Sequence, residues 1–307
     1  MDPPGRRLRL RRTDAGQLHA ARAAPGRVRF DHGRRVRGER QRARAHGGRV
    51  GREPAAVIEV HDSAAEAGRA VAAEIAALAR SGAVLGLATG ASPLPVYAEL
   101  VRLHRERNAS FRRCTLFHLD EYWPLRRDHP QSFRSFLRRH LLDHLDVPAQ
   151  SSHCPDGETP AEKLAEHCAG YEALIRAAGG IDLQLLGIGR NGHIGFNEPG
   201  SARDSRTRLI ELETATRADA AADFGDLQQV PRHAITMGIA SILEARRIVL
   251  LAFGARKAAI LRRALEGPLT ADVPASFLRE HPDVRVVLDR EAAAGLGGRS
   301  AQAAGWP

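Results

Sequence analysis

The sequence has only three cysteines and two lysines among its 307 residues, and its apolar runs are short. The cysteines are widely spaced and form no CxxC pair, so neither a disulfide framework nor a metal site is expected at Cys114, Cys154 and Cys168. No segment has the continuous apolar stretch of a signal peptide or a transmembrane helix, so no membrane partner is expected. These absences are typical of a protein of the reducing cytoplasm.

The net charge of +10 is unevenly distributed along the chain. Residues 1–52 hold 16 arginines against 4 acidic residues, whereas the remainder has 30 basic and 32 acidic residues. A basic arm can adhere to nucleic acid or act as a transit peptide, but no patterned aromatic or apolar residues accompany this charge. We therefore expect residues 1–54 to be a disordered arginine-rich extension, or the product of a start assigned too far upstream. No specific nucleic-acid partner is expected.

Apolar segments alternate with amphipathic ones from residue 57 onward. The apolar segments predict strands at 57–60, 83–88, 114–119, 181–186, 247–253 and 284–288. Strands that are apolar throughout and separated by helices imply a parallel sheet covered on both faces. We predict one α/β domain over residues 55–295, built on a single doubly wound, mostly parallel, Rossmann-like sheet. The polar stretch 201–231 predicts a mobile lid, and residues 296–307 predict a flexible tail.

Three local signals predict where helices begin. Ser63 and Glu66 form a capping box before an amphipathic run, and Thr159 and Glu162 form a second one. Pro93 follows the strand at 83–88 closely and suits the first turn of a helix, because its fixed φ is already helical.

The run Leu185-Leu-Gly-Ile-Gly-Arg-Asn-Gly-His-Ile-Gly-Phe-Asn-Glu-Pro199 reads as a buried strand that enters a glycine-rich loop. Glycines let such a loop turn tightly and approach a ligand closely. His193 and Glu198 can titrate there, and Asn191 can orient them. A lone loop histidine is more often structural, but a nearby carboxylate among glycines favours an enzyme site.

Polar residues also follow three other predicted strands, at the edge where open α/β sheets bind ligands. The turn Thr89-Gly90-Ala91-Ser92 can bind an anion through helix N-terminal amides and two hydroxyls, although Ser92 is also an ordinary N-cap candidate. Lys257 works against the dipole of the helix it begins, so it is better explained as a phosphate partner. Asp120 can serve as a base if burial raises its pKa, or can simply cap a turn.

Several separate motifs resemble the glucosamine-6-phosphate deaminase family, also called the glucosamine/galactosamine-6-phosphate isomerases. The resemblance runs from about residue 57 to residue 296. Its motifs are Leu85-Gly-Leu-Ala-Thr-Gly-Ala-Ser-Pro93, Leu119-Asp-Glu-Tyr122, Gly187-Ile-Gly-Arg-Asn-Gly-His-Ile-Gly-Phe-Asn-Glu-Pro199, Ser205-Arg-Thr-Arg208 and Gly254-Ala-Arg-Lys257. It implies conversion of glucosamine 6-phosphate and water to fructose 6-phosphate and ammonia, without a metal or an organic cofactor.

The resemblance also implies roles for single residues. His193 would open the sugar ring with the help of Glu198 and Asn191, and Asp120 would move a proton from C2 to C1. The phosphate and the rest of the substrate would contact Thr89, Gly90, Ala91, Ser92, Gly187, Gly189 and Lys257. A homo-oligomer is left open.

Two departures from the family pattern keep alternatives open. Many members have an aspartate in place of Asn191, and Ala222 stands where a phosphate-binding arginine is usual. Arg208 or Arg217 are candidates to replace that arginine. The alternatives are a galactosamine-6-phosphate deaminase, a sugar-phosphate lactonase of the same fold, or a sugar-phosphate sensor.

Overall fold

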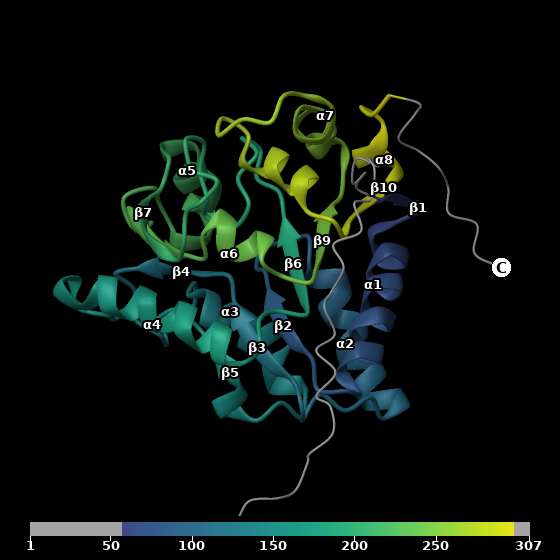
Figure 1. The fold of residues 1–307 in the computed structure, drawn as a ribbon, viewed down its shortest axis with the longest axis horizontal. Coiled ribbons are helices and arrows are strands. Elements are labelled where there is room, and N and C mark those ends of the chain that lie inside the picture. The colour runs from purple at the N-terminus through teal and green to yellow at the C-terminus, as the bar shows by residue number, and fades with distance from the viewer. Residues whose placement is uncertain (1–56, 298–307) are drawn as a thin grey trace, which may run out of the picture. The chain divides into compact units, whose positions relative to one another are not determined.

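The computed structural model describes residues 57–297 (Figure 1). The expected extension at 1–54 lies outside the described residues, and so does the expected tail beyond residue 297. Within the described part, seven parallel strands form the main sheet in the order β1-β10-β9-β6-β2-β3-β5. Their bounds are β1 Val57–His61, β2 Val84–Leu87, β3 Thr115–His118, β5 Ser152–His153, β6 Leu183–Gly187, β9 Arg247–Ala252 and β10 Val284–Asp289.

The central strands of this sheet are buried on both faces, as their continuous apolar sequence predicts. Every residue of β2 is buried, and so are nearly all residues of β6 and β9. The helices that cover the sheet include α1 and α2, which pack side by side (Figure 1). The helices are α1 Ala64–Ala79, α2 Leu94–Arg107, α3 Phe133–His140, α4 Leu164–Ala177, α5 Thr214–Phe224, α6 Ile239–Leu243, α7 Ala258–Glu266 and α8 Arg290–Ala293. The prediction of an α/β fold with a parallel sheet is confirmed.

One predicted capping box forms and the other does not. The Ser63 hydroxyl accepts from the backbone N–H of Glu66 at 3.2 Å and begins α1 as expected. Thr159 caps no helix, because residues Ala161–Lys163 form a short 3-10 turn and α4 begins only at Leu164. The Thr159 carbonyl accepts from the Trp123 indole at 2.8 Å, which ties this segment to β4.

A second, antiparallel sheet was not expected. Its order is β4-β8-β7, with bounds β4 Asp120–Trp123, β8 His233–Thr236 and β7 Arg208–Glu211. The prediction of a single sheet is therefore incomplete. Asp120 does not sit in a turn after β3 but begins β4, where it is paired with Thr236.

The stretch predicted as a lid, residues 201–231, carries β7 and α5. Helix α5 is anchored to the small sheet by an aromatic cluster, in which Phe224 contacts Tyr122 with ring centroids 5.2 Å apart. Tyr122 in turn contacts Phe133 of α3 and Phe196 of the glycine-rich loop. The end of α5, the start of α3 and the loop therefore share one small core.

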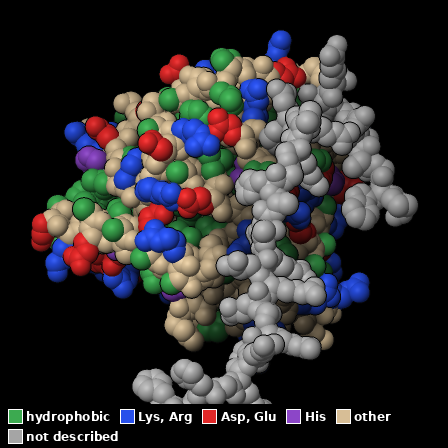
Figure 2. Space-filling model, viewed as in Figure 1, with side chains coloured by type: hydrophobic (Ala, Val, Ile, Leu, Met, Phe, Trp, Pro, Cys, Tyr) green, Lys and Arg blue, Asp and Glu red, His purple; other side chains and the backbone are tan. Residues whose placement is uncertain are grey.

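Charges of both signs are interspersed over the face of the molecule that Figure 2 shows. None of the helices within residues 57–297 combines the length and apolar character needed to cross a membrane.

Replacing Phe224 with alanine should loosen α5 while the parallel sheet stays folded. Phe224 is 9% exposed and packs on the small core and on the ring of His129, so we expect the free energy of unfolding to fall by about 3 kcal/mol. Backbone amides of α5 should exchange with solvent faster, as measured by hydrogen–deuterium exchange. Leu227→Ala, at an exposed side chain of the same stretch, is the control. Unchanged exchange in α5 would contradict this assignment.

Candidate active site

Four neighbouring strands of the main sheet carry the predicted site residues at their carboxyl ends. In the sheet order β9-β6-β2-β3, these ends lead to Lys257, to the glycine-rich loop, to Thr89–Ser92 and to Asp120. The strands are parallel and adjacent, so their ends lie along one edge. The structure thus brings together the four segments that sequence analysis placed at a ligand crevice.

Asp120 is a buried carboxyl group with an unpartnered oxygen. It is 4% exposed, and its Oδ1 is buried without a hydrogen-bond partner among the described residues. Burial, reinforced by the negative charge of Glu121, raises the pKa of Asp120 well above its usual range. A carboxylate of raised pKa is a stronger base once it is ionised, which suits proton abstraction from carbon.

Glu121, beside Asp120, has a structural role. Its carboxylate accepts from the backbone N–H groups of Tyr122, Phe133 and Arg134 at 2.9–3.0 Å, and so binds the start of α3 to β4.

His193, Glu198 and Asn191 form a contiguous polar group in the loop. Nδ1 of His193 lies 3.3 Å from Oε2 of Glu198, close enough for an ion pair although the atoms are not aligned for a hydrogen bond. The Asn191 amide donates to the same Oε2 at 2.7 Å. Burial acts to raise the pKa of this carboxylate, but interactions with His193, Thr216 and Asn191 outweigh it and hold the pKa below its usual value. The group therefore favours an ionised Glu198 beside the imidazole.

Two glycines make this arrangement possible. A Cβ on Gly189 would lie 2.3–2.4 Å from atoms of the His193 imidazole, so only glycine lets the ring pack against the loop. Gly192 has a φ of +93°, which other residues rarely adopt, and a Cβ there would meet Val273 at 2.8 Å.

The predicted phosphate residues approach the loop from two sides. Nζ of Lys257 donates to the Ile188 carbonyl at 2.6 Å. On the other side, the Ser92 hydroxyl lies beside Gly187, 3.9 Å from where a Cβ would stand. Ser92 is not the N-cap of α2, because that position is taken by Pro93, so its hydroxyl is not used for capping. Thr89, Gly90 and Ala91 form the turn that leads from β2 to Ser92.

Among the described residues, no cluster of three or more His, Cys, Asp or Glu side chains has the geometry of a metal site. The groups that converge here are proton donors, proton acceptors and cations.

Comparison with known proteins places the chain in a family. The sequence model described as "Glucosamine-6-phosphate isomerases/6-phosphogluconolactonase" matches residues 59–287. The chain belongs to this family. A glucosamine-6-phosphate deaminase of Rhodopirellula baltica is 52% identical over 213 residues, covering 69% of this chain and 84% of the relative. A glucosamine-6-phosphate deaminase of Arthrobacter sp. (strain FB24) is 49% identical over 214 residues, or 70% and 82% of the two chains.

Solved structures agree with this membership. A monomeric glucosamine-6-phosphate deaminase superimposes with a TM-score of 0.76 at 41% identity, covering 78% of this chain and 100% of the other. A 6-phosphogluconolactonase from Trypanosoma brucei superimposes with a TM-score of 0.62 at 22% identity, over 79% and 99% of the two chains. The lactonase and the present chain therefore share a fold.

One further residue of the polar group, Glu213, was not predicted from the sequence. The Asn191 amide donates its second hydrogen to Glu213, at 2.9 Å, and Glu213 is the residue that precedes α5. Nothing in the weakly patterned stretch 201–231 signals this contact, because it depends on how α5 packs on the loop.

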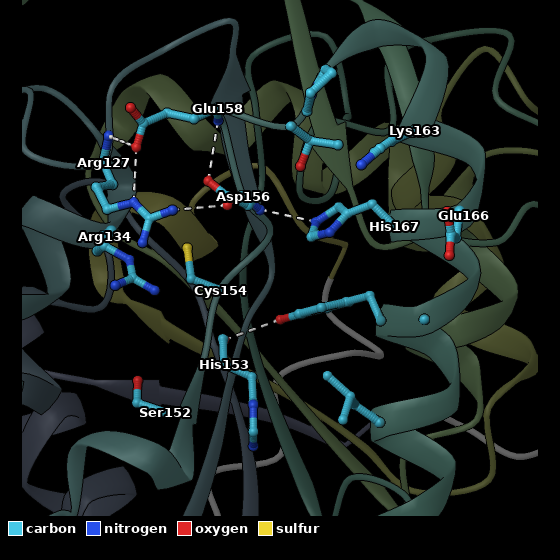
Figure 3. Close-up of a pocket in the computed structure, with 15 residues that line it drawn as sticks. Arg127, Arg134, Ser152, His153, Cys154, Asp156, Glu158, Lys163, Glu166 and His167 are labelled. Atoms are coloured by element: carbon cyan, nitrogen blue, oxygen red, sulfur yellow. Dashed lines mark hydrogen bonds and ion pairs between the residues drawn. The ribbon is translucent and has the colours of Figure 1, made fainter.

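A pocket of about 960 Å³ lies between β5, α4 and the segment joining β4 to α3 (Figure 3). Arg127 crosses its wall to reach Asp156 at 3.0 Å and Glu158 at 2.8 Å. Its lining includes none of the predicted catalytic or substrate-binding residues. The candidate active site therefore rests on the side chains that converge at the sheet edge and not on this pocket.

The Asp120 carboxyl should titrate well above the ordinary aspartate range, and this can be followed by ¹³C NMR of the labelled carboxyl. Glu121→Gln should lower the pKa of Asp120, because it removes a neighbouring negative charge and keeps an oxygen that accepts from the α3 amides. An Asp120 that titrates at its ordinary pH would show that the group is better solvated than the structure indicates.

Proposed function

We propose that this protein converts glucosamine 6-phosphate and water to fructose 6-phosphate and ammonia. The observation that carries the proposal is the buried carboxyl of Asp120, with its unpartnered oxygen, on the sheet edge that also carries the His193–Glu198 pair. An aldose–ketose isomerisation needs one base for the C1–C2 bond, and opening of a pyranose ring needs a separate proton carrier. The relatives named as glucosamine-6-phosphate deaminases support the same reaction.

Ring opening is assigned to His193. The protonated imidazole gives a proton to the ring oxygen and then takes the proton of the C1 hydroxyl, which becomes an aldehyde. Glu198, held ionised by its neighbours, stabilises the protonated imidazole. Asn191 fixes the orientation of the pair through its bond to the Glu198 carboxylate.

Isomerisation is assigned to Asp120. The ionised carboxylate takes the proton from C2 of the open-chain sugar, the imidazole of His193 returns a proton to the C1 oxygen, and an enolamine forms. Asp120 then returns its proton to C1, which leaves a protonated imine at C2. Water adds to that carbon and ammonia leaves, which gives the ketose.

The 6-phosphate is assigned to Lys257 and to the turn Thr89–Ser92, with Gly187 and Gly189 giving the substrate close access to the backbone. Lys257 and Ser92 flank the same loop, so a phosphate between them would hold the sugar at a fixed distance from His193.

We place the reaction in the cytoplasm, because a phosphorylated sugar carries charge that keeps it on one side of a membrane. A homo-oligomer stays a prediction, and one solved relative is described as monomeric.

Incubation with glucosamine 6-phosphate should release ammonia and fructose 6-phosphate in equal amounts, measured by coupled assays with galactosamine 6-phosphate run in parallel. If only galactosamine 6-phosphate is turned over, the proposed mechanism still holds but galactosamine 6-phosphate is the substrate. Absence of product from both would contradict the proposal, and hydrolysis of 6-phosphogluconolactone would then indicate the lactonase.

Asp120→Asn should lower turnover of glucosamine 6-phosphate by at least ~10²-fold, since the amide cannot accept the C2 proton. A lactonase needs no base at C2, so the same variant would retain lactone hydrolysis. Exchange of the C2 hydrogen with deuterated water, followed by NMR, should stop in the variant. Continued exchange would show that another group is the base.

A further inference from the structure

Positive charge gathers where Lys257 meets the glycine-rich loop. Lys257 binds the Ile188 carbonyl, two residues before Arg190 in the chain. Burial lowers the pKa of Lys257, although the nearby carboxylate of Asp219 acts to raise it. Arg190 and Arg256 add to the lowering through their positive charges. The charges of Arg190, Arg256 and Asp219 therefore all act on Lys257.

Arg190 is joined to Asp219 by a bidentate ion pair. Its Nε donates to Oδ2 at 2.9 Å, and its Nη2 donates to Oδ1. The side chains are 59% and 52% exposed, so water competes with the pair and its net stabilisation is small. The guanidinium of Arg190 therefore binds the Asp219 carboxylate with the same two parallel donors that it would offer to a phosphate. The bond to Asp219 is weak, because both side chains are exposed.

The two arginines that sequence analysis named as substitutes for a lid arginine are already engaged. Arg208 donates to the side chains of Asn197 and Ser201 at 2.8 and 3.0 Å. Arg217 donates to two backbone carbonyls in the segment that follows α5. Arg190, whose pair is exposed, is better placed to exchange its partner.

We propose that Arg190 joins Lys257 in binding the 6-phosphate, and that Asp219 holds Arg190 until the phosphate displaces it. The inference rests on the proposed function for the identity of the phosphate. Asp219 then competes with the substrate phosphate for the guanidinium of Arg190. When the phosphate displaces Asp219, the contact between α5 and the loop is lost.

The exchange follows from charge and geometry. A phosphate monoester carries more negative charge than a carboxylate and offers three acceptor oxygens, so it can bind Arg190 and Lys257 at once. Asp219 is a side chain of α5 and already occupies two of the donors of Arg190. Substrate binding would also relieve the mutual repulsion between the two cations. Ala222 has no charge with which to bind a phosphate. In this proposal Arg190 of the glycine-rich loop supplies the positive charge that the usual arginine at position 222 would supply.

Binding of inorganic phosphate to the full-length protein, measured by isothermal titration calorimetry, tests the inference without turnover. Arg190→Ala should weaken binding roughly 10-fold or more, the loss expected for a charge-assisted hydrogen bond. Asp219→Asn should strengthen binding, because it removes the competitor. That gain should shrink when Arg190→Ala is also present, since the two residues act on each other.

The kinetics with glucosamine 6-phosphate should rank the variants as phosphate affinity does, with Asp219→Asn binding most tightly and Arg190→Ala most weakly. Arg190→Ala should raise KM and leave kcat nearly unchanged, and Asp219→Asn should lower KM. Arg126→Ala is the matched control, since Arg126 forms an exposed bidentate pair with Asp128 outside the site. It should change neither constant. All of these side chains are exposed, so circular dichroism and thermal melting should match the wild type.

Two results have distinct meanings. Phosphate affinity that is equal in Arg190→Ala and the wild type would overturn the inference, even if glucosamine 6-phosphate is turned over. Phosphate binding that depends on Arg190, in a protein that releases no ammonia from the sugar phosphate, would support the anion site and overturn the proposed function.

Discussion

The backbone of Leu119 holds the two sheets together, and the candidate site is built around that junction. Its N–H donates to the Leu87 carbonyl of β2 at 3.0 Å, and its carbonyl accepts from the Met237 N–H at 2.9 Å. The chain therefore leaves the parallel sheet and enters the antiparallel one within a single residue, just before Asp120. A carboxylate at such a junction is buried by both sheets, and this burial is the main cause of its raised pKa.

The same junction also fixes the glycine-rich loop. The Thr236 hydroxyl, on the strand that pairs with β4, accepts from the Phe196 N–H at 3.1 Å. The Asn197 amide donates to the carbonyls of Ile194 and Met237 at 2.9 and 2.8 Å. The loop that carries His193 is thus tied to the strand that positions Asp120. The proposed base and the proposed ring-opening group share one support, which holds them in a constant relation.

The parts of this arrangement that sequence could predict are those that depend on neighbours in the chain. The capping box at Ser63 and the apolar strands are local patterns, and parallel strands bring their ends to one edge in any register. The small sheet was not predictable, because β4 (Asp120–Trp123) pairs with β8 (His233–Thr236), which is far from it in the sequence. The contacts of Glu213 and Asp219 were equally hidden, because both depend on the packing of α5. The capping box at Thr159 failed because the residues after it form a short 3-10 turn, and α4 begins only at Leu164.

Asn191 shows how the unpredicted contacts change the meaning of a predicted residue. Its amide nitrogen has two hydrogens, and each binds a different carboxylate, Glu198 or Glu213. An aspartate there would add a third negative charge beside the two glutamates and remove both donors, so asparagine fits the contact with the start of α5. The start of α5 is bound to the proposed ring-opening group through Asn191, and its middle is bound to the same loop through Arg190. Both contacts join α5 to consecutive residues of the loop, Arg190 and Asn191, which lie between Gly189 and Gly192. A substrate that displaces one contact therefore also affects the position of the other.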